Sequence, residues 1–161
     1  MKKFLKMKDG FTGVDISISM IIVLIFIPTI FGIVYNIGKT NSDIRRKAEA
    51  INISTNILEI IKSENYSEIT TSSTKLNQDI SSKYQTSTYK NTEKEESGYS
   101  YIYYLANGEN NEHYQIQVGI KNYYPTEDNT QDLIKQIKVR VFYVTGNDVK
   151  DIDIGTTVQN T

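Results

Sequence analysis

The sequence predicts an α+β fold, with one long N-terminal helix packed on a roughly four-stranded antiparallel sheet. Three observations lead to this prediction. A mostly apolar run without charges covers residues 16–37, an amphipathic pattern with a helical period follows at 39–63, and alternation with a period of two dominates from residue 99 onward. A sheet with one apolar face needs a cover, and the amphipathic half of the helix supplies it.

The uncharged run from Ile16 to Ile37 has 22 residues. As a helix it would be roughly 33 Å long, enough to cross the ~30 Å hydrocarbon core of a bilayer once. A cleaved secretory signal has a shorter apolar region and ends at a small-x-small site, which does not follow here. An ordinary signal anchor stays open as an alternative. Charge does not decide the orientation of this segment, because four lysines and one aspartate precede it in residues 1–10 while Lys39, Arg45, Arg46 and Lys47 follow it. The positive-inside rule leans toward a cytoplasmic N-terminus.

Asp15 lies directly before this run, where an ionised carboxylate costs a few kcal/mol. The junction "KDG-FT-GVD" at residues 8–15 resembles the processing site of type IV prepilins and pseudopilins. That family has a short basic leader ending in Gly, then an aromatic residue or Met, an acid at the fifth mature position and a long apolar helix. The resemblance implies that residues 1–10 are a leader, that a prepilin peptidase cleaves after Gly10, and that Phe11 becomes N-methylated.

The resemblance also gives Asp15 a partner. Cleavage would create an α-ammonium group at Phe11, and in a filament of parallel helices the Asp15 carboxylate of one subunit can pair with this amine of its neighbour. Breaking such a buried pair typically costs about 3–5 kcal/mol. By resemblance, Asp15 and Thr12 serve subunit assembly, and the partners are other pilin subunits and the assembly machinery of the inner membrane. The family usually has Glu where Asp15 stands and a large apolar residue where Gly13 stands, which fits a minor pilin.

Pro28, Gly32 and Gly38 interrupt the helical pattern of the apolar segment, residues 11–38. Proline removes a backbone hydrogen bond and clashes with the preceding turn. One interpretation is an ordinary kink in a membrane helix. The pilin resemblance implies instead that these residues allow local unwinding when the subunit leaves the bilayer for the filament.

Residues 39–63 continue the helix as an amphipathic segment, so that one helix is expected from about Phe11 to Lys62. A surface helix that binds lipid or a calmodulin-type partner is the alternative, but the charges of this segment are mixed. The apolar stripe expected to face the sheet comprises Ile44, Ala48, Ala50, Ile51, Ile53, Ile57, Leu58, Ile60 and Ile61.

The remaining chain is expected to form a polar connecting loop at 64–98 and the sheet of a globular head at 99–161. The loop would contain one short strand or helical turn near residues 80–88. Strands are expected at 99–105, 113–124, 134–144 and 149–158, with Asn107-Gly108 as a hairpin turn and Gly146-Asn147-Asp148 as another. The inward-facing residues are expected to be Tyr114, Ile116, Val118, Ile120, Ile137, Val139, Val141, Tyr143, Ile152 and Ile154.

Catalytic motifs are missing from the sequence. Without cysteine, and with His113 as the single histidine, thiol chemistry, a catalytic triad and a multi-histidine metal site are excluded. Asp148, Asp151 and Asp153 could bind calcium only if a loop gathered them, and their spacing lacks the pattern of a calcium loop. We therefore expect no enzyme, no cofactor and no metal. The mildly acidic chain also argues against nucleic-acid binding.

The chain has 12 tyrosines, of which Tyr99, Tyr101 and Tyr103 would share one face of a strand. Cross-strand packing is the favoured interpretation and surface recognition the alternative. The leading functional hypothesis is a pilin-like subunit, anchored by one membrane span before assembly and part of an extracellular filament afterwards. The alternatives are a pseudopilin of a secretion or DNA-uptake system, an adhesin at a filament tip, and a membrane-anchored sensor or enzyme unrelated to pili.

Overall fold

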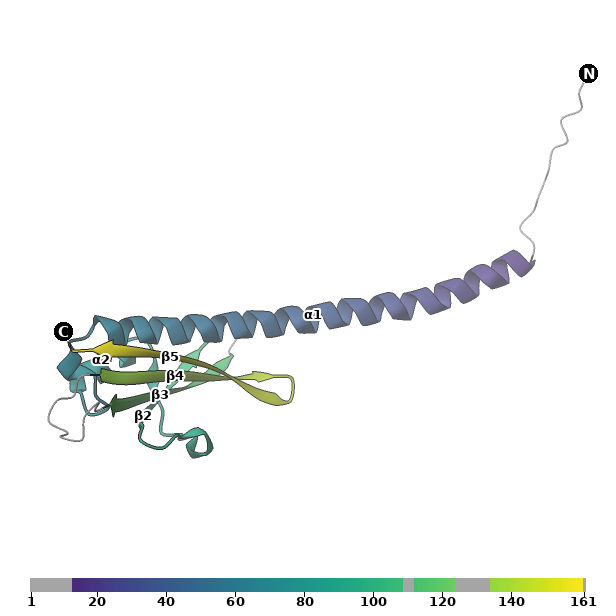
Figure 1. Ribbon diagram of the computed structural model, residues 1–161. Coiled ribbons are helices and arrows are strands. Elements are labelled where there is room, and N and C mark those ends of the chain that lie inside the picture. The colour runs from purple at the N-terminus through teal and green to yellow at the C-terminus, as the bar shows by residue number, and fades with distance from the viewer. Residues whose placement is uncertain (1–12, 109–111, 124–133, 161) are drawn as a thin grey trace, which may run out of the picture. The chain divides into compact units, whose positions relative to one another are not determined.

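The computed structural model of the protein describes residues 13–108, 112–123 and 134–160 (Figure 1). It confirms the α+β fold, with one long helix, α1, at Gly13–Ser63 and an antiparallel sheet. The chain divides into two compact units, residues 1–42 and 43–161. In the first unit every described residue is helical. The second unit contains the rest of α1 and the whole sheet.

The sheet has the strand order β1-β2-β3-β4-β5, and each pair is antiparallel. The four long strands agree with the predicted strands to within two residues at each end. The structure adds a fifth strand of two residues that pairs with the edge of the first long one, with Gln85 opposite Leu105. The strands are β1 at Gln85–Thr86, β2 at Ser100–Asn107, β3 at His113–Tyr123, β4 at Ile134–Thr145 and β5 at Asp148–Gln159.

A tight hairpin joins β4 and β5. Thr145 is the partner of Asp148 across a two-residue turn, and Gly146 in that turn has φ 60°. Positive φ is costly for most residues but not for glycine, and the turns of two-residue hairpins require it. From this turn the register continues without a break to Ile134 opposite Gln159.

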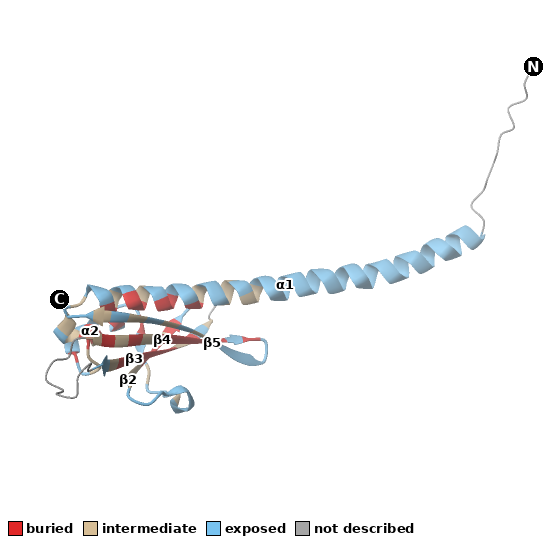
Figure 2. Ribbon diagram, viewed as in Figure 1, coloured by how far each residue is buried: buried red, intermediate tan, exposed pale blue. Residues whose placement is uncertain are grey.

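The core lies between one face of the sheet and the second half of α1 (Figure 2). The inward faces predicted for β3 and β4 are confirmed, since all eight of their residues are buried, while Ile152 and Ile154 of β5 are partly buried against the same core. The residues of α1 that are buried are Ala50, Ile53, Ser54, Ile57, Leu58 and Ile61.

The predicted stripe on α1 was too wide. Ile44 is 61% exposed, Ile51 is 40% exposed, and Ala48 between them is exposed as well. At 100° per residue these three side chains lie roughly 120° around the helix from the buried row. The sheet therefore covers a single row of α1 and leaves a second apolar row of the same helix uncovered.

Residues 64–98 are more than the polar connecting loop that the sequence indicated. They contain the helix α2 at Thr74–Ser81, the short 3₁₀ turns η1 at Tyr66–Glu68 and η2 at Thr92–Lys94, and β1. Ser73 caps α2 by accepting a hydrogen bond from the backbone N–H of Leu76 at 3.2 Å. The isolated apolar side chains of this segment belong to the core, namely Ile69, Leu76, Ile80 and Tyr84.

Candidate functional site

The first unit presents an uncovered apolar helix surface. Every large apolar side chain from Val14 to Ile37 is between 48% and 74% exposed. By length and composition this part of α1 could cross a membrane, since its mean hydropathy reaches 2.6 over an 18-residue window in which no residue is buried. A surface this apolar needs lipid or protein to cover it.

Asp15, the predicted assembly residue, lies in the first turn of α1. The partial positive charge of a helix N-terminus favours a carboxylate at this position. The same turn is tied by serine side chains, because Ser17 donates to the carbonyl of Gly13 at 2.8 Å and Ser19 to the carbonyl of Asp15 at 2.7 Å. The other predicted processing and assembly residues, Gly10, Phe11 and Thr12, lie outside the described residues.

The predicted flexibility residues Pro28, Gly32 and Gly38 all lie within the continuous helix α1. Pro28 has no N–H to donate, so the helix lacks one hydrogen bond there. A Cβ atom added at Gly32 or Gly38 would meet no other described atom within 4 Å. Packing inside this unit therefore does not explain either glycine, and their role in local unwinding stays a prediction.

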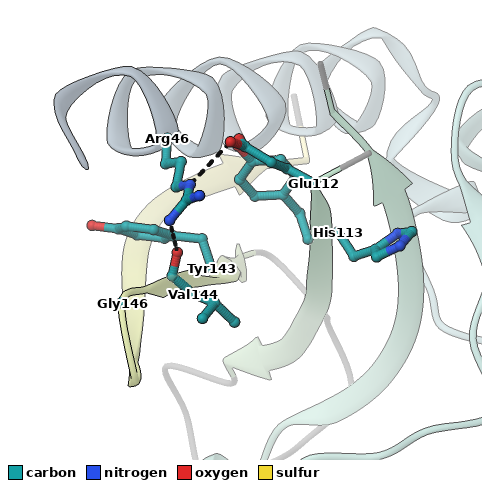
Figure 3. A pocket seen from close by; sticks show the side chains of 7 residues that line it. Arg46, Glu112, His113, Tyr143, Val144 and Gly146 are labelled. Atoms are coloured by element: carbon teal, nitrogen blue, oxygen red, sulfur yellow. Dashed lines mark hydrogen bonds and ion pairs between the residues drawn. The ribbon is translucent and has the colours of Figure 1, made fainter. Parts of the chain in front are cut away.

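In the second unit, Glu112 joins the sheet to α1 (Figure 3). Its Oε1 accepts hydrogen bonds from Arg45 Nη2 at 2.6 Å and from Arg46 Nε at 3.0 Å. The hydroxyl of Tyr114 lies 3.0 Å from Glu112 Oε2 and 2.8 Å from Glu49 Oε2. Burial raises the pKa of Glu112, but the hydrogen bonds and charges of these neighbours outweigh it, so the pKa of this carboxyl lies below its usual value.

Burial is the main cause that raises the pKa of Tyr114, and the two carboxylates beside its hydroxyl raise it further. The Tyr114 hydroxyl therefore stays protonated and can donate to these carboxylates. Arg46 also donates from Nη1 to the carbonyl of Val144 at 2.9 Å, which ties α1 to the β4–β5 hairpin as well. We name Arg45, Arg46, Glu49, Glu112 and Tyr114 the carboxylate clasp.

A cavity of about 480 Å³ opens beside the clasp. The one histidine of the chain lies at its rim, where the His113 Nδ1 atom is 2.9 Å from Asn107 Oδ1. The charged groups of the cavity wall, Arg46 and Glu112, pair with each other at 3.0 Å, and this ion pair connects α1 to the sheet. The lining residues are Arg46, Glu112, His113, Tyr114, Tyr143, Val144 and Gly146.

Two of the three aspartates considered for calcium, Asp151 and Asp153, pair with Arg140. Arg140 Nη2 lies 2.6 Å from Asp153 Oδ2, and its Nε lies 3.5 Å from Asp151 Oδ2. Asp148 is exposed at the start of β5. Among the described residues no group of three or more His, Cys, Asp or Glu side chains could hold a metal ion. Asp151 and Asp153 instead take part in an ion-pair network on the sheet.

The three strand tyrosines lie on the sheet face that α1 does not cover. The rings of Tyr99 and Tyr101 stack with centroids 6.0 Å apart. The Tyr99 hydroxyl lies 3.4 Å from Gln136 Oε1, Tyr101 accepts from the backbone N–H of Glu96 at 2.7 Å, and Tyr103 donates to Glu95. These contacts favour the packing interpretation over the alternative of surface recognition.

Comparisons of the chain with protein-family models, with curated proteins and with solved structures find no match. The functional conclusion therefore depends on the residues of the chain itself. The sequence did not reveal the carboxylate clasp, because its members come from two segments, 45–49 and 112–114, that are far apart in the chain. Only the pair Arg45-Arg46 stands out in the sequence.

Proposed function

We propose that this protein is a pilin-like structural subunit that is cleaved after Gly10 and assembles through its N-terminal helix into an extracellular filament, as a minor pilin. Before assembly it is a single-pass membrane protein processed by a prepilin peptidase. Its later partners are other pilin subunits and the assembly machinery of the inner membrane. The observation that carries the proposal is an acid, Asp15, at the start of a helix whose large apolar side chains from Val14 to Ile37 are all exposed.

The apolar side chains and the acid beside them each need a partner. Lipid would cover the apolar side chains before assembly, and helices of neighbouring subunits would cover them afterwards. A carboxylate carried into such surroundings is costly unless a positive charge meets it. Cleavage after Gly10 supplies that charge, because it leaves an α-ammonium group on Phe11 of each subunit.

The first experiment measures the intact mass of the full-length chain produced in its native host. We expect a mass lower by residues 1–10 and higher by one methyl group. The variant Gly10→Ala should keep the leader, because the peptidase would lose the glycine before the cleaved bond. A mature wild-type protein that still begins with Met1 would contradict the proposal.

The second experiment measures how much of the protein enters filaments sheared from intact cells. Asp15→Ala should be cleaved normally but enter filaments poorly, and Asp15→Glu should restore entry because it restores the charge. Asp43→Ala, which removes an acid of the same helix beyond the apolar segment, is the matched control and should assemble like the wild type. Equal incorporation of Asp15→Ala and Asp43→Ala would remove the role proposed for Asp15.

A further inference from the structure

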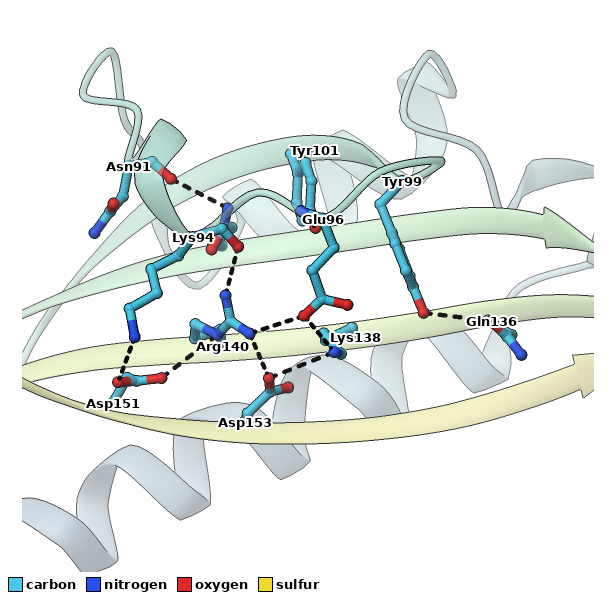
Figure 4. Close-up of polar contacts among 11 residues, drawn as sticks. Asn91, Lys94, Glu96, Tyr99, Tyr101, Gln136, Lys138, Arg140, Asp151 and Asp153 are labelled. Carbon is cyan, nitrogen blue, oxygen red and sulfur yellow. Dashed lines mark hydrogen bonds and ion pairs between the residues drawn. The ribbon is translucent and has the colours of Figure 1, made fainter.

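Residues 88–98 cross the face of the sheet that α1 does not cover (Figure 4). We name this segment the strap. None of its residues, all of which the structure describes, is buried, and its one aromatic side chain, Tyr89, is 58% exposed. The hydrophobic effect therefore contributes little to holding the strap in place.

The strap covers side chains that are well shielded from solvent. Beneath it Tyr103, Gln117 and Phe142 of three neighbouring strands are all less than 10% exposed. The fit is imperfect, because a narrow void between Asn91, Gln117 and Phe142 remains. Gln117 Oε1 is buried without a hydrogen-bond partner. The Nε2 atom of the same side chain makes a long hydrogen bond of 3.4 Å to the carbonyl of Asn91. An unsatisfied buried acceptor weakens the closed arrangement.

Polar contacts to β4 hold the strap instead. Arg140 donates from Nη1 to the carbonyl of Lys94 at 2.6 Å and from Nη2 to Glu96 Oε1 at 3.2 Å. Lys138 Nζ lies 2.7 Å from the same Glu96 oxygen. Lys138 and Arg140 also form ion pairs with β5, where Asp153 Oδ2 lies 3.6 Å from Lys138 Nζ.

Three further contacts complete the attachment. Lys94 Nζ lies 3.7 Å from Asp151 Oδ1, the backbone N–H of Glu96 donates to the Tyr101 hydroxyl at 2.7 Å, and Tyr103 donates to Glu95. The ion pairs of Glu96 and Lys94 are partly exposed, and salt screens such pairs strongly. The sheet beneath is held by backbone hydrogen bonds and the apolar core, which salt does not weaken.

We propose that the strap is a releasable cover, which ion pairs hold on the outer face of the sheet and which high ionic strength detaches while the sheet stays folded. Detachment uncovers Tyr103, Gln117 and Phe142 as a mixed aromatic and amide surface. All the contacts lie within residues 43–161, so this inference does not rest on the proposed function.

The test is amide hydrogen exchange of the full chain in detergent micelles, read by mass spectrometry. Raising NaCl from about 0.1 M to about 1 M shortens the Debye length from roughly 10 Å to roughly 3 Å. Exchange in residues 88–98 should then become roughly three- to ten-fold faster, as expected if one or two partly exposed ion pairs are lost. Exchange in β3 and β4 should not change. A second readout is hydroxyl-radical labelling of Phe142, which should rise with salt.

Two variants make the test specific. Glu96→Gln removes the strap carboxylate that pairs with Lys138 and Arg140 and leaves the Lys94–Asp151 pair in place. The strap should therefore exchange faster than the wild type at low salt and respond less to added salt. Lys150→Gln, a change of an exposed β5 cation outside this network, is the matched control and should behave like the wild type. The inference is overturned if strap exchange does not depend on salt, if Glu96→Gln leaves it unchanged, or if strap and sheet open together.

Discussion

At Gly108 the connection between β2 and β3 lies so close to the side chains of Glu49 and Tyr114 that a Cβ atom would have to displace them. A Cβ atom there would lie 2.5 Å from Glu49 Oε1 and 2.5 Å from Tyr114 Cε2. Both neighbours belong to the carboxylate clasp, and the Gly108 N–H donates to the carbonyl of Glu112 at 2.7 Å. At the scale of single residues, this glycine is what lets the hairpin close on the helix.

Gly108→Ala should therefore lower the free energy of unfolding by about 1–3 kcal/mol, the usual cost of overpacking a close contact. Gly155→Ala is the control, because a Cβ atom there comes no nearer than 3.4 Å to another atom, the carbonyl oxygen of Ile137. Urea unfolding of both variants gives the comparison. Equal stability of the two variants would mean that the clasp moves aside without cost.

At the scale of elements, the second half of α1 buries one apolar row and leaves another uncovered. Ile57 is fully buried, whereas Ile51 is 40% exposed, although both belong to the stripe expected from the sequence. The cost of removing a side chain depends on the contacts that it makes, so chemically identical residues of one helix should differ in stability.

Ile57→Ala should lower the free energy of unfolding by about 2–5 kcal/mol, while Ile51→Ala should lower it by less than about 1 kcal/mol. Thermal or urea unfolding measures both. Similar losses for the two variants would show that the second row is covered in the folded protein. The same experiment therefore tests whether Ile51 lies outside the buried row of α1.

The two-residue turn of the β4–β5 hairpin also fixes which backbone groups of the edge strand β5 point outward. Residues that flank such a turn, here Thr145 and Asp148, form a hydrogen-bonded pair, and bonded and non-bonded pairs alternate from there. Thr156 should thus bond to Ile137 of β4, while the N–H of Thr157 should point away from the sheet.

Thr157→Pro should be tolerated, since proline is found on edge strands where the N–H faces outward. Thr156→Pro should lower the free energy of unfolding by at least about 1–3 kcal/mol, because it leaves a carbonyl of β4 without its partner. Circular dichroism melting of the pair of variants measures the difference. If Thr156→Pro were more stable than Thr157→Pro, the assumed alternation of hydrogen-bonded and non-bonded pairs along this hairpin would be wrong.

At the scale of the whole molecule, the chain has no disulfide to hold the head together, and its core includes four buried tyrosines, Tyr84, Tyr104, Tyr114 and Tyr143. Burial raises the pKa of Tyr104 to about 12, and its hydroxyl donates to Asn77 Oδ1 at 2.7 Å. A raised pKa in the folded state gives stability that is complete below the unfolded value of 10.0 and is lost as the pH rises toward 12.

The free energy of unfolding should therefore fall as the pH rises from 10 to 12. Tyr104→Phe should flatten this decline by up to about 1.4 kcal/mol per pH unit, even though it lowers stability at neutral pH. Tyr89→Phe, a change of an exposed ring, should leave the slope unchanged. Urea unfolding at several pH values gives the slopes, and an unchanged slope for Tyr104→Phe would contradict the prediction.

Hydrophobic periodicity is a local property that each segment carries alone, and it was enough to predict the long helix, the four long strands and the inward faces of β3 and β4. The sequence also contained the resemblance around Gly10 and Asp15 on which the proposed function depends. The folded chain alone shows which row of α1 is buried, that Leu76 and its neighbours in 64–98 join the core, and that Glu112 and Arg140 contact partners that are distant in the sequence. These features depend on which segments meet in space, and a pattern read along the chain does not contain that information.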